Sequence, residues 1–246
     1  MSSDEAYTDP EFARLYDAEN PWHPMDDFYQ GLDLAAASVL DVGCGTGTRL
    51  ASTRRRGHGG TLVGVDPAEA MLDIARVKAP DVRWVRGHAQ TLDLGERFAL
   101  VTMTGHAFQL LLDDAAVREA LATFRRHLEP GGLLAFETRN PAARPWRHWT
   151  REETLVGITA PDGEPYLSWV EEPREHDADL VTFAGRIRSM CSGRQRTTTA
   201  TLRFVDPEHL RTLLTGAGLA IEGWFGDWDS SPVTPTSPEV IVLARA

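Results

Sequence analysis

A run of alternating glycines follows an acidic residue near the start of the chain. Residues 39–47 read Val-Leu-Asp-Val-Gly-Cys-Gly-Thr-Gly, and Thr48 then begins a segment that favours a helix. The apolar run before the glycines is typical of a buried parallel strand. Glycines let a backbone bend tightly and approach a ligand closely, and the N–H groups at a helix start face that ligand. The stretch therefore predicts a turn that cradles a nucleotide.

A second acidic residue fits the same chemistry. Asp66 ends the apolar run 61–65, about twenty residues after the glycines, where a carboxylate accepts hydrogen bonds from both ribose hydroxyls of an adenosine. Pro67 is expected to open the next helix, with Met71 packed near the adenine. The alternative is that Asp66 only caps this helix.

The glycine spacing distinguishes between nucleotide ligands. A dinucleotide-binding loop needs its third glycine three residues after the second, and Thr48 occupies that position. The alternating form with Asp41 resembles the first motif of class I S-adenosylmethionine (SAM)-dependent methyltransferases of the small-molecule type, similar to amino-sugar N-methyltransferases and related bacterial enzymes. The resemblance covers the chain outside residues 141–203. It implies SAM as cofactor and an α/β, Rossmann-like, seven-stranded sheet whose last strand lies antiparallel between its neighbours.

The resemblance also implies a set of cofactor contacts, with one departure from the family pattern. His88 stands where the family usually carries an aspartate that accepts from the adenine amino group. A neutral imidazole can still accept a hydrogen bond, or else His88 only caps a turn. Tyr7 and Tyr29 are the tyrosines chosen to reach the cofactor, although such aromatic residues also pack helices onto sheets. The expected contacts are Tyr7, Tyr29, Asp41, Gly43, Cys44, Gly45, Thr46, Asp66, Pro67, Met71, His88, Ala89, Gln90, Met103 and Thr104.

Residues expected near the methyl acceptor follow the later strands. His106 comes after the fourth strand, and ligands of open α/β sheets bind at the carboxyl ends of strands. A hydroxyl acceptor would need a general base such as His106, whereas an amine needs one only if it arrives protonated. His106 is therefore the candidate catalytic residue, with a structural or substrate-orienting role as its alternative. The expected acceptor contacts are His106, Arg139, Trp169 and Arg186.

The strands that must position these residues can be read along the chain. Residues 39–42, 61–65, 82–85, 98–103, 133–137, 219–225 and 240–244 predict the large sheet, with amphipathic helices near 113–128 and 206–216. Helical periodicity is absent from residues 141–203, where alternating segments at 166–172, 180–190 and 195–204 predict a small antiparallel sheet. We expect residues 1–140 and 204–246 to form the SAM-binding core, with cap helices in 1–31, and residues 141–203 to form a lid over the acceptor site.

Four arginines of the predicted insertion are expected to lie on one face. Arg186, Arg188, Arg194 and Arg196 share one parity on two strands of an expected hairpin. Like charges opposite each other cost stability unless water or an anion relieves them. A solvated face is the favoured interpretation, and an anionic group of the substrate is the alternative.

Composition excludes several classes of function. The 246 residues are 42% hydrophobic and 25% charged, and a formal charge of −11 argues against general affinity for nucleic acid. No apolar run is long enough to span a membrane, and residues 1–9 lack the apolar core of a signal peptide. With only Cys44 and Cys191 there is no disulfide framework, so we expect a cytoplasmic protein. No residue cluster has metal-ligand spacing, and a homodimer is left open.

The leading interpretation is a SAM-dependent methyltransferase that methylates nitrogen or oxygen of a small-molecule acceptor. A non-catalytic SAM-binding or regulatory protein is the first alternative, because His88 replaces the usual aspartate. A nucleotide-dependent dehydrogenase is disfavoured by Thr48 and by the lack of a second dinucleotide-binding half.

Overall fold

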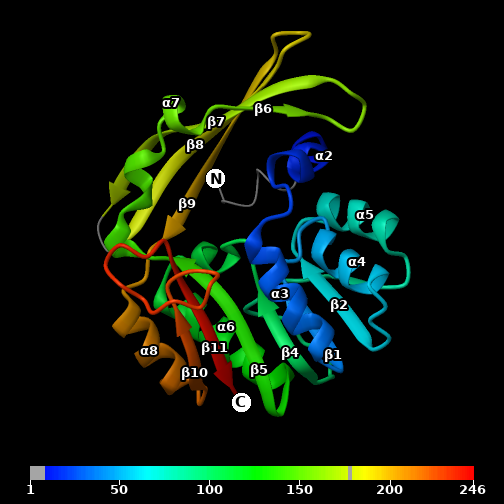
Figure 1. The fold of residues 1–246 in the computed structure, drawn as a ribbon, viewed down its shortest axis with the longest axis vertical. Helices are drawn as coiled ribbons and strands as arrows, with labels where there is room; N and C mark the ends of the chain where they lie inside the picture. Colours follow the sequence, from blue (N-terminus) through cyan, green and yellow to red (C-terminus); the bar gives the residue numbers. More distant parts are fainter. Residues whose placement is uncertain (1–8, 177–178) are drawn as a thin grey trace.

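A computed structural model describes residues 9–176 and 179–246, so Tyr7, expected to contact the cofactor, lies outside the described residues. The large sheet has the order β10-β11-β5-β4-β1-β2-β3 (Figure 1). Strands β1 to β5 pair in parallel, and β11 runs antiparallel between β10 and β5, which confirms the predicted fold. The strands are β1 Ser38–Val42, β2 Thr61–Asp66, β3 Arg83–Arg86, β4 Phe98–Met103, β5 Leu128–Arg139, β10 Ala220–Phe225 and β11 Glu239–Arg245.

Helices cover both faces of this sheet, which is why its central strands are mainly apolar. Leu40 and Val42 of β1 join a core cluster with residues of α6 and α8, whereas Val39 joins a second cluster with residues of α3 and α4. Side chains alternate between the faces of a strand, so a strand buried on both sides needs apolar residues in succession. The helices are α3 Pro24–Ala35, α4 Thr48–Arg55, α5 Glu69–Lys78, α6 Asp114–His127 and α8 Pro207–Gly216.

The insertion forms a second, antiparallel sheet of order β6-β7-β8-β9. The sequence predicted three of its strands but missed β6 and the short helices before it. Segments of three or four residues are too short to show the periodicity of a strand or a helix. The strands are β6 Val156–Thr159, β7 Pro165–His176, β8 Leu180–Ser189 and β9 Gln195–Arg203, and the missed helices are η2 Pro141–Ala143, η3 Pro145–His148 and α7 Arg151–Thr154.

Helix α2, Pro10–Glu19, lies between the second sheet and α5 (Figure 1). Its Leu15 packs against Ile158, Tyr166 and Ile187 of the second sheet. The Ser168 hydroxyl donates a hydrogen bond to Glu19, with an oxygen–oxygen distance of 2.5 Å. The short helix η1, Ala107–Leu110, contacts β9 from the core side. The second sheet is thus attached to the core through α2 and η1.

Strand register corrects the predicted face of the four arginines. Arg186 lies opposite Thr197, while Arg196 lies opposite Ile187. Directly paired residues share a face, so Arg196 points to the face opposite Arg186 and Arg188. Parity in the sequence does not carry across a turn, and Arg194 lies in that turn outside both strands. Arg196 instead forms ion pairs with Asp9 and Glu11 at the start of α2.

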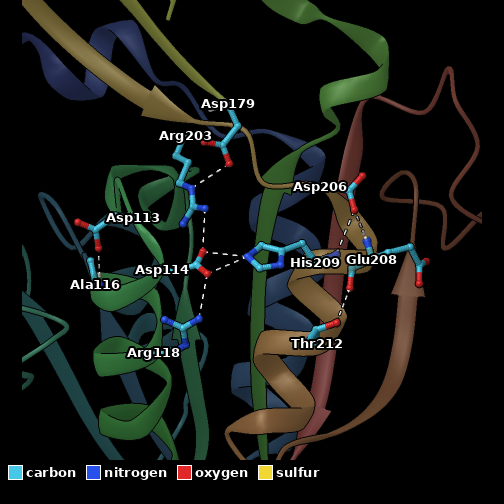
Figure 2. Close-up of polar contacts among 10 residues, drawn as sticks. All are labelled: Asp113, Asp114, Ala116, Arg118, Asp179, Arg203, Asp206, Glu208, His209 and Thr212. Carbon is cyan, nitrogen blue, oxygen red and sulfur yellow. Dashed lines mark hydrogen bonds and ion pairs between the residues drawn. The ribbon is translucent and has the colours of Figure 1, made fainter. Parts of the chain in front are cut away.

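A cluster of charges at Asp114 joins the base of the second sheet to the core (Figure 2). Arg203, at the end of β9, donates to Asp114 at 2.8 Å and to Asp179 at 2.9 Å. The His209 ring nitrogen Nε2 lies 2.9 Å from Asp114 Oδ1, which links α6 to α8. The hydrogen bonds from His209 and Arg203 hold the pKa of Asp114 at about 2, below its ordinary value.

In the part of the chain that the structure describes, no helix combines the length and apolarity needed to cross a membrane.

Asp114→Asn should lower the free energy of unfolding by about 1 kcal/mol near neutral pH, because the partly exposed cluster is screened by water. The folded-state pKa is depressed, so this stabilisation is present above the ordinary carboxyl pKa and lost as pH falls through about 2. Urea denaturation from pH 7 to pH 3 should therefore show the two proteins converging. Glu119→Gln, at an exposed position of α6, is the matched control, and a difference that grows on acidification would contradict the assignment.

Candidate functional site

The glycine loop has the shape that its sequence predicts. Gly43, Gly45 and Gly47 all have positive φ angles, of 78°, 52° and 70°. The Gly43 and Cys44 N–H groups donate to the Val65 carbonyl at 2.8 and 3.0 Å, which ties the loop to β2. A Cβ atom on Gly47 would lie 2.4 Å from the Trp84 ring, so only glycine fits there. Burial raises the pKa of the Cys44 thiol well above its usual range, which makes it a packed thiol and no nucleophile.

Asp66 lies beside this loop at the end of β2. Its carboxylate accepts from the Gly45 N–H and the Ala68 N–H, each at 2.9 Å, and the residue is 7% exposed. A carboxylate oxygen can accept more than one hydrogen bond. Pro67 does not open the helix as predicted, because α5 begins at Glu69 after the turn that Asp66 closes. Asp66 therefore fixes the loop and the start of α5 in one position.

Asp41 is buried beneath the loop, in an ionic cluster that the sequence did not reveal. Arg49 forms ion pairs with Asp33 of α3 and with Asp41 of β1, the latter at 2.7 Å. Arg49 also donates to Thr102 of β4 at 2.7 Å, and Thr102 donates to Asp41 at 2.8 Å. The neighbouring carboxylates raise the pKa of Arg49 further although burial opposes this, so it stays charged. Asp41, predicted to contact the cofactor, thus has its side chain engaged by the core.

Helix α2 lies over the glycine loop and contacts it directly. The Tyr16 ring lies 3.6 Å from where a Cβ of Gly45 would be, and the Tyr16 hydroxyl 4.0 Å from the same point on Gly105. Asp17 accepts from Thr46 at 2.5 Å and pairs with Lys78 of α5 at 2.5 Å. Tyr7 and Tyr29 were preferred to Tyr16 as the predicted cofactor contacts, and no role was predicted for Lys78. No local sequence pattern indicates that an acidic residue of α2 forms an ion pair with a lysine at the end of α5.

His106 lies at the carboxyl edge of the sheet, in a backbone conformation that is uncommon for a side-chain-bearing residue. Its φ is 58°, and its N–H donates to the Glu137 carboxylate at 2.6 Å. The Tyr29 hydroxyl donates to the other oxygen of Glu137 at 2.5 Å. Glu137 is fully buried, and burial raises its pKa above the ordinary value. Two elements distant in sequence, α3 and the loop after β4, are therefore joined through one carboxyl group.

The antiparallel β11 brings a second acid to His106. Glu239 lies directly opposite Arg139 in the β11–β5 register, so both point to the face that carries Glu137. Both Glu239 carboxylate oxygens lie 3.0 Å from His106 Nε2. Burial raises the pKa of Glu239 to about 8, although Arg139 opposes this, while burial and Arg139 lower the pKa of His106 to about 3. Near neutral pH the two side chains therefore share one proton and carry no net charge.

Arg139, expected to contact the acceptor, borders this pair. It donates to Gln109 at 2.8 Å, and its guanidinium lies 5.6 Å from the centre of the Trp149 ring. Trp149 in turn packs edge-on against Phe183 of the second sheet, with ring centres 4.7 Å apart. The His106–Glu239 pair therefore lies next to Arg139, and the Trp149 and Phe183 rings connect Arg139 to the inserted sheet.

Three predicted site residues have their side chains engaged in other contacts. The Tyr29 ring is buried against Phe28 and Trp228, and its hydroxyl serves Glu137. Trp169 lies opposite Arg186, on the face of β7 that turns away from α2, and stacks with Arg151 at 4.8 Å. Arg186 itself is engaged by Glu171 and by Thr197. The sequence indicates the order of the strands but not their register. Register decides which face of the sheet each side chain occupies.

The remaining predicted cofactor residues lie around the loop, in the turn after β3 or at the end of β4. Met71 packs with Ala13 of α2, and Met103 and Ala89 join the main core. His88 is exposed, and its carbonyl accepts from the Thr91 and Leu92 N–H groups. The Gln90 carbonyl accepts from the Thr123 hydroxyl, and the Thr104 carbonyl from the Ala107 N–H. In the described segments, no three or more His, Cys, Asp or Glu residues cluster so as to hold a metal ion.

Comparison with known proteins identifies the loop and the strands around it. A methyltransferase domain family matches residues 39–132, from the glycine loop to the start of β5. Residues 39–132 are therefore similar to a methyltransferase domain. SAM is the cofactor of this domain class, which agrees with the glycine spacing.

Individual relatives extend the match beyond this domain. The CcbJ methyltransferase of Streptomyces caelestis has a TM-score of 0.75 and 25% identity, with 98% of each chain covered. A SAM-bound amino pentose methyltransferase of Micromonospora echinaspora has a TM-score of 0.70 and 24% identity, covering 94% of this chain and 97% of that one.

A curated relative from Streptomyces fradiae, dTDP-3-amino-3,6-dideoxy-alpha-D-glucopyranose N,N-dimethyltransferase, is 33% identical over 61% of this chain and 58% of its own length. The chain spans about half the length of the first curated amino-sugar methyltransferases that it matches.

Arg49→Met should lower the free energy of unfolding by about 3–5 kcal/mol, because it leaves Asp33 and Asp41 buried without their cation. Urea denaturation of the full chain measures this loss. Arg55→Met, on the exposed side of the same helix, should change stability by less than about 0.5 kcal/mol. A loss below about 1 kcal/mol for Arg49→Met would mean that the cluster does not hold α3, β1 and β4 together.

Proposed function

We propose that this chain transfers the methyl group of SAM to a nitrogen of a small-molecule acceptor. The observation that carries the proposal is that a glycine loop with Asp66 shares one sheet edge with a buried pair, His106 and Glu239. Ligands of open α/β sheets bind at this edge. A nucleoside site and a proton-handling site in contact with the same edge suit methyl transfer to an amine that arrives protonated.

The residues around the loop suit the cofactor. SAM supplies a methyl group on a positively charged sulfonium. The Asp66 carboxylate is the group that would accept from the ribose hydroxyls, and Gly43, Gly45 and Thr46 form the surface that would face the nucleoside. Met71, His88, Ala89 and Gln90 would border the adenine. Positioning and exclusion of water are then the main contributions of the protein.

Helix α2 is the cap of this cofactor site in the proposal. Tyr16 rests on Gly45, and Asp17 is bonded to Thr46 and Lys78, so α2 lies on the surface that the nucleoside would face. Entry of SAM then requires α2 to move outward, and the Asp17–Lys78 ion pair opposes that movement. Tyr16 replaces Tyr29 as the tyrosine expected to reach the cofactor.

Residues 141–203 form the lid over the acceptor in the same proposal. The Trp149 and Phe183 contact brings the insertion next to Arg139. A cavity of about 240 Å³ lies between α2 and the second sheet, where Leu15 lines it together with charged residues such as Glu11 and Arg196. Apolar surface such as that of Trp149 and Phe183 can cover an acceptor and exclude water from the reaction.

Nitrogen is favoured over oxygen as the acceptor atom. The similar proteins from S. fradiae and M. echinaspora are named for methylation of amino sugars. Carboxyl groups buried at the edge of the sheet complement a cationic ammonium better than a neutral hydroxyl.

Ligand binding and turnover test the proposal together. SAM at a hundredfold excess over its Kd should stabilise the folded chain by about 2.7 kcal/mol, seen as a rise in Tm, and NAD should not. Mass spectrometry should then detect methylation of dTDP-3-amino-3,6-dideoxyglucose and not of dTDP-6-deoxyglucose, which lacks the amine. Stabilisation by NAD alone would refute the cofactor assignment. Stabilisation by SAM with no transfer to a broad amine panel would indicate a SAM-binding protein without this activity.

Asp66→Asn should weaken SAM binding by about 1.5–3 kcal/mol, or roughly 10- to 150-fold in Kd, the range for hydrogen bonds to a charged group. The substitution keeps the shape of the side chain but leaves one acceptor oxygen in place of two. Isothermal titration calorimetry gives the affinity, and circular dichroism verifies the fold. Asp73→Asn, at an exposed position of α5, is the matched control. If Asp66→Asn and the wild type bind SAM with equal affinity, Asp66 does not contact the cofactor and only holds Gly45 and Ala68 in position.

A further inference from the structure

Glu239 differs from the other buried acids of the sheet edge in how it is bonded. Glu137 accepts from Tyr29 and from the His106 N–H, and Asp66 accepts from two backbone N–H groups. Within the described residues, the Glu239 carboxyl group has one hydrogen-bonding partner, the His106 ring. The side chain of Glu239 is 11% exposed and that of His106 is 18% exposed. A buried carboxyl group with one partner retains acceptor capacity for a ligand.

The backbone around Glu239 is fixed by neighbouring elements. The Glu239 N–H donates to the Gly226 carbonyl at 3.1 Å. The Asn140 amide donates to the Thr234 and Ser237 carbonyls, each at 2.9 Å, and so holds the loop that leads into β11. On the other side, the Glu137 carboxylate fixes the His106 backbone in its left-handed conformation. Both members of the pair are therefore rigidly held, as a group that must meet a substrate should be.

Resting on the proposed function, we propose that Glu239 and His106 act as one base, which binds the acceptor as an ammonium ion and removes its proton. An N–H bond of the ammonium breaks, its electron pair stays on nitrogen, and the proton passes to the Glu239 carboxylate. The amine is left neutral, with its lone pair free to receive the methyl group. The proton returns to water when the product leaves.

The charges that face the pair set the pH at which it works. Arg139 on β5 favours the Glu239 carboxylate, whereas Asp227, in the loop after β10, opposes it. Glu137 favours a charged His106, and Tyr29 keeps its proton because burial raises its pKa well above the ordinary value. With the pKa of Glu239 at about 8, the base form is the carboxylate that accumulates as pH rises through that value. Below it, the pair already holds its proton and cannot accept another.

Glu239→Gln tests the proposal with an amide of the same shape. With dTDP-3-amino-3,6-dideoxyglucose as acceptor, kcat/KM at pH 8 should fall by about 10²- to 10⁴-fold, while the Kd for SAM stays within twofold. Wild-type kcat/KM should rise through about pH 8 and fall where the free amine loses its proton. The variant should show the reverse trend, with kcat/KM rising only as the free amine loses its proton.

The partner residue and a control complete the kinetic test. His106→Asn retains a residue that tolerates positive φ, and it should lose a similar factor in kcat/KM. The double variant should be no slower than the slower single variant, because the two residues act as a unit. Glu222→Gln, at the Arg245 ion pair on the exposed side of β10, should leave the pH profile unchanged. A Glu239→Gln enzyme within threefold of the wild type, with the wild-type profile, would overturn the proposal.

An infrared measurement separates this inference from the proposed function. The wild type without acceptor should show a protonated carboxyl band that is absent from Glu239→Gln and that disappears as pH rises through about 8. If no amine is methylated but this band behaves as stated, the proposed function fails and the proton-holding pair stands. If Glu239 is already ionised at pH 6, the pair is not the base described here, whatever the activity.

Discussion

The buried charge of Arg49 is the constraint on which the sheet edge depends. Arg49 lies in the first turn of α4, where the positive end of the helix dipole disfavours a cation. Asp33 and Asp41 compensate, and in doing so they attach α3 and β1 to the helix that follows the glycine loop. The loop geometry, the position of α3 and hence the Tyr29 contact with Glu137 all depend on this one cation. The basic residue at an unfavourable helix position was the available sequence signal.

The sequence predicted what is encoded locally. The glycine loop, the buried strands and Asp66 at the end of β2 follow from short patterns with a physical reason at each position. Trp169 and Arg186 could not be placed in this way, because their faces depend on strand register and on a bulge in β7 between Glu171 and Arg174. Tyr16 was not selected among the tyrosines, because the packing of α2 on the loop is a tertiary contact between segments about thirty residues apart. The missed partners are all of this non-local kind.

The reversed direction of β11 explains how the candidate base is assembled. A parallel last strand would bring its carboxyl end to the site, whereas an antiparallel strand brings its first residue. Glu239 is that first residue, and the pairing with β5 sets it beside Arg139 and on the face of Glu137. Chain reversal therefore places an acid from the end of the sequence next to His106 from its middle. Spacing along the chain gives no hint of this pair.

The two buried acids that meet at His106 differ in how their carboxyl groups are bonded. Glu137 is saturated by Tyr29 and the His106 N–H, so it serves to fix the backbone of the loop after β4. Glu239 faces the imidazole alone, between the attraction of Arg139 and the repulsion of Asp227. A low-dielectric site makes an unpaired carboxylate costly, so Glu239 holds a proton until a cation approaches or the pH rises. An ammonium ion would supply both the charge that ionises Glu239 and the proton that neutralises it again.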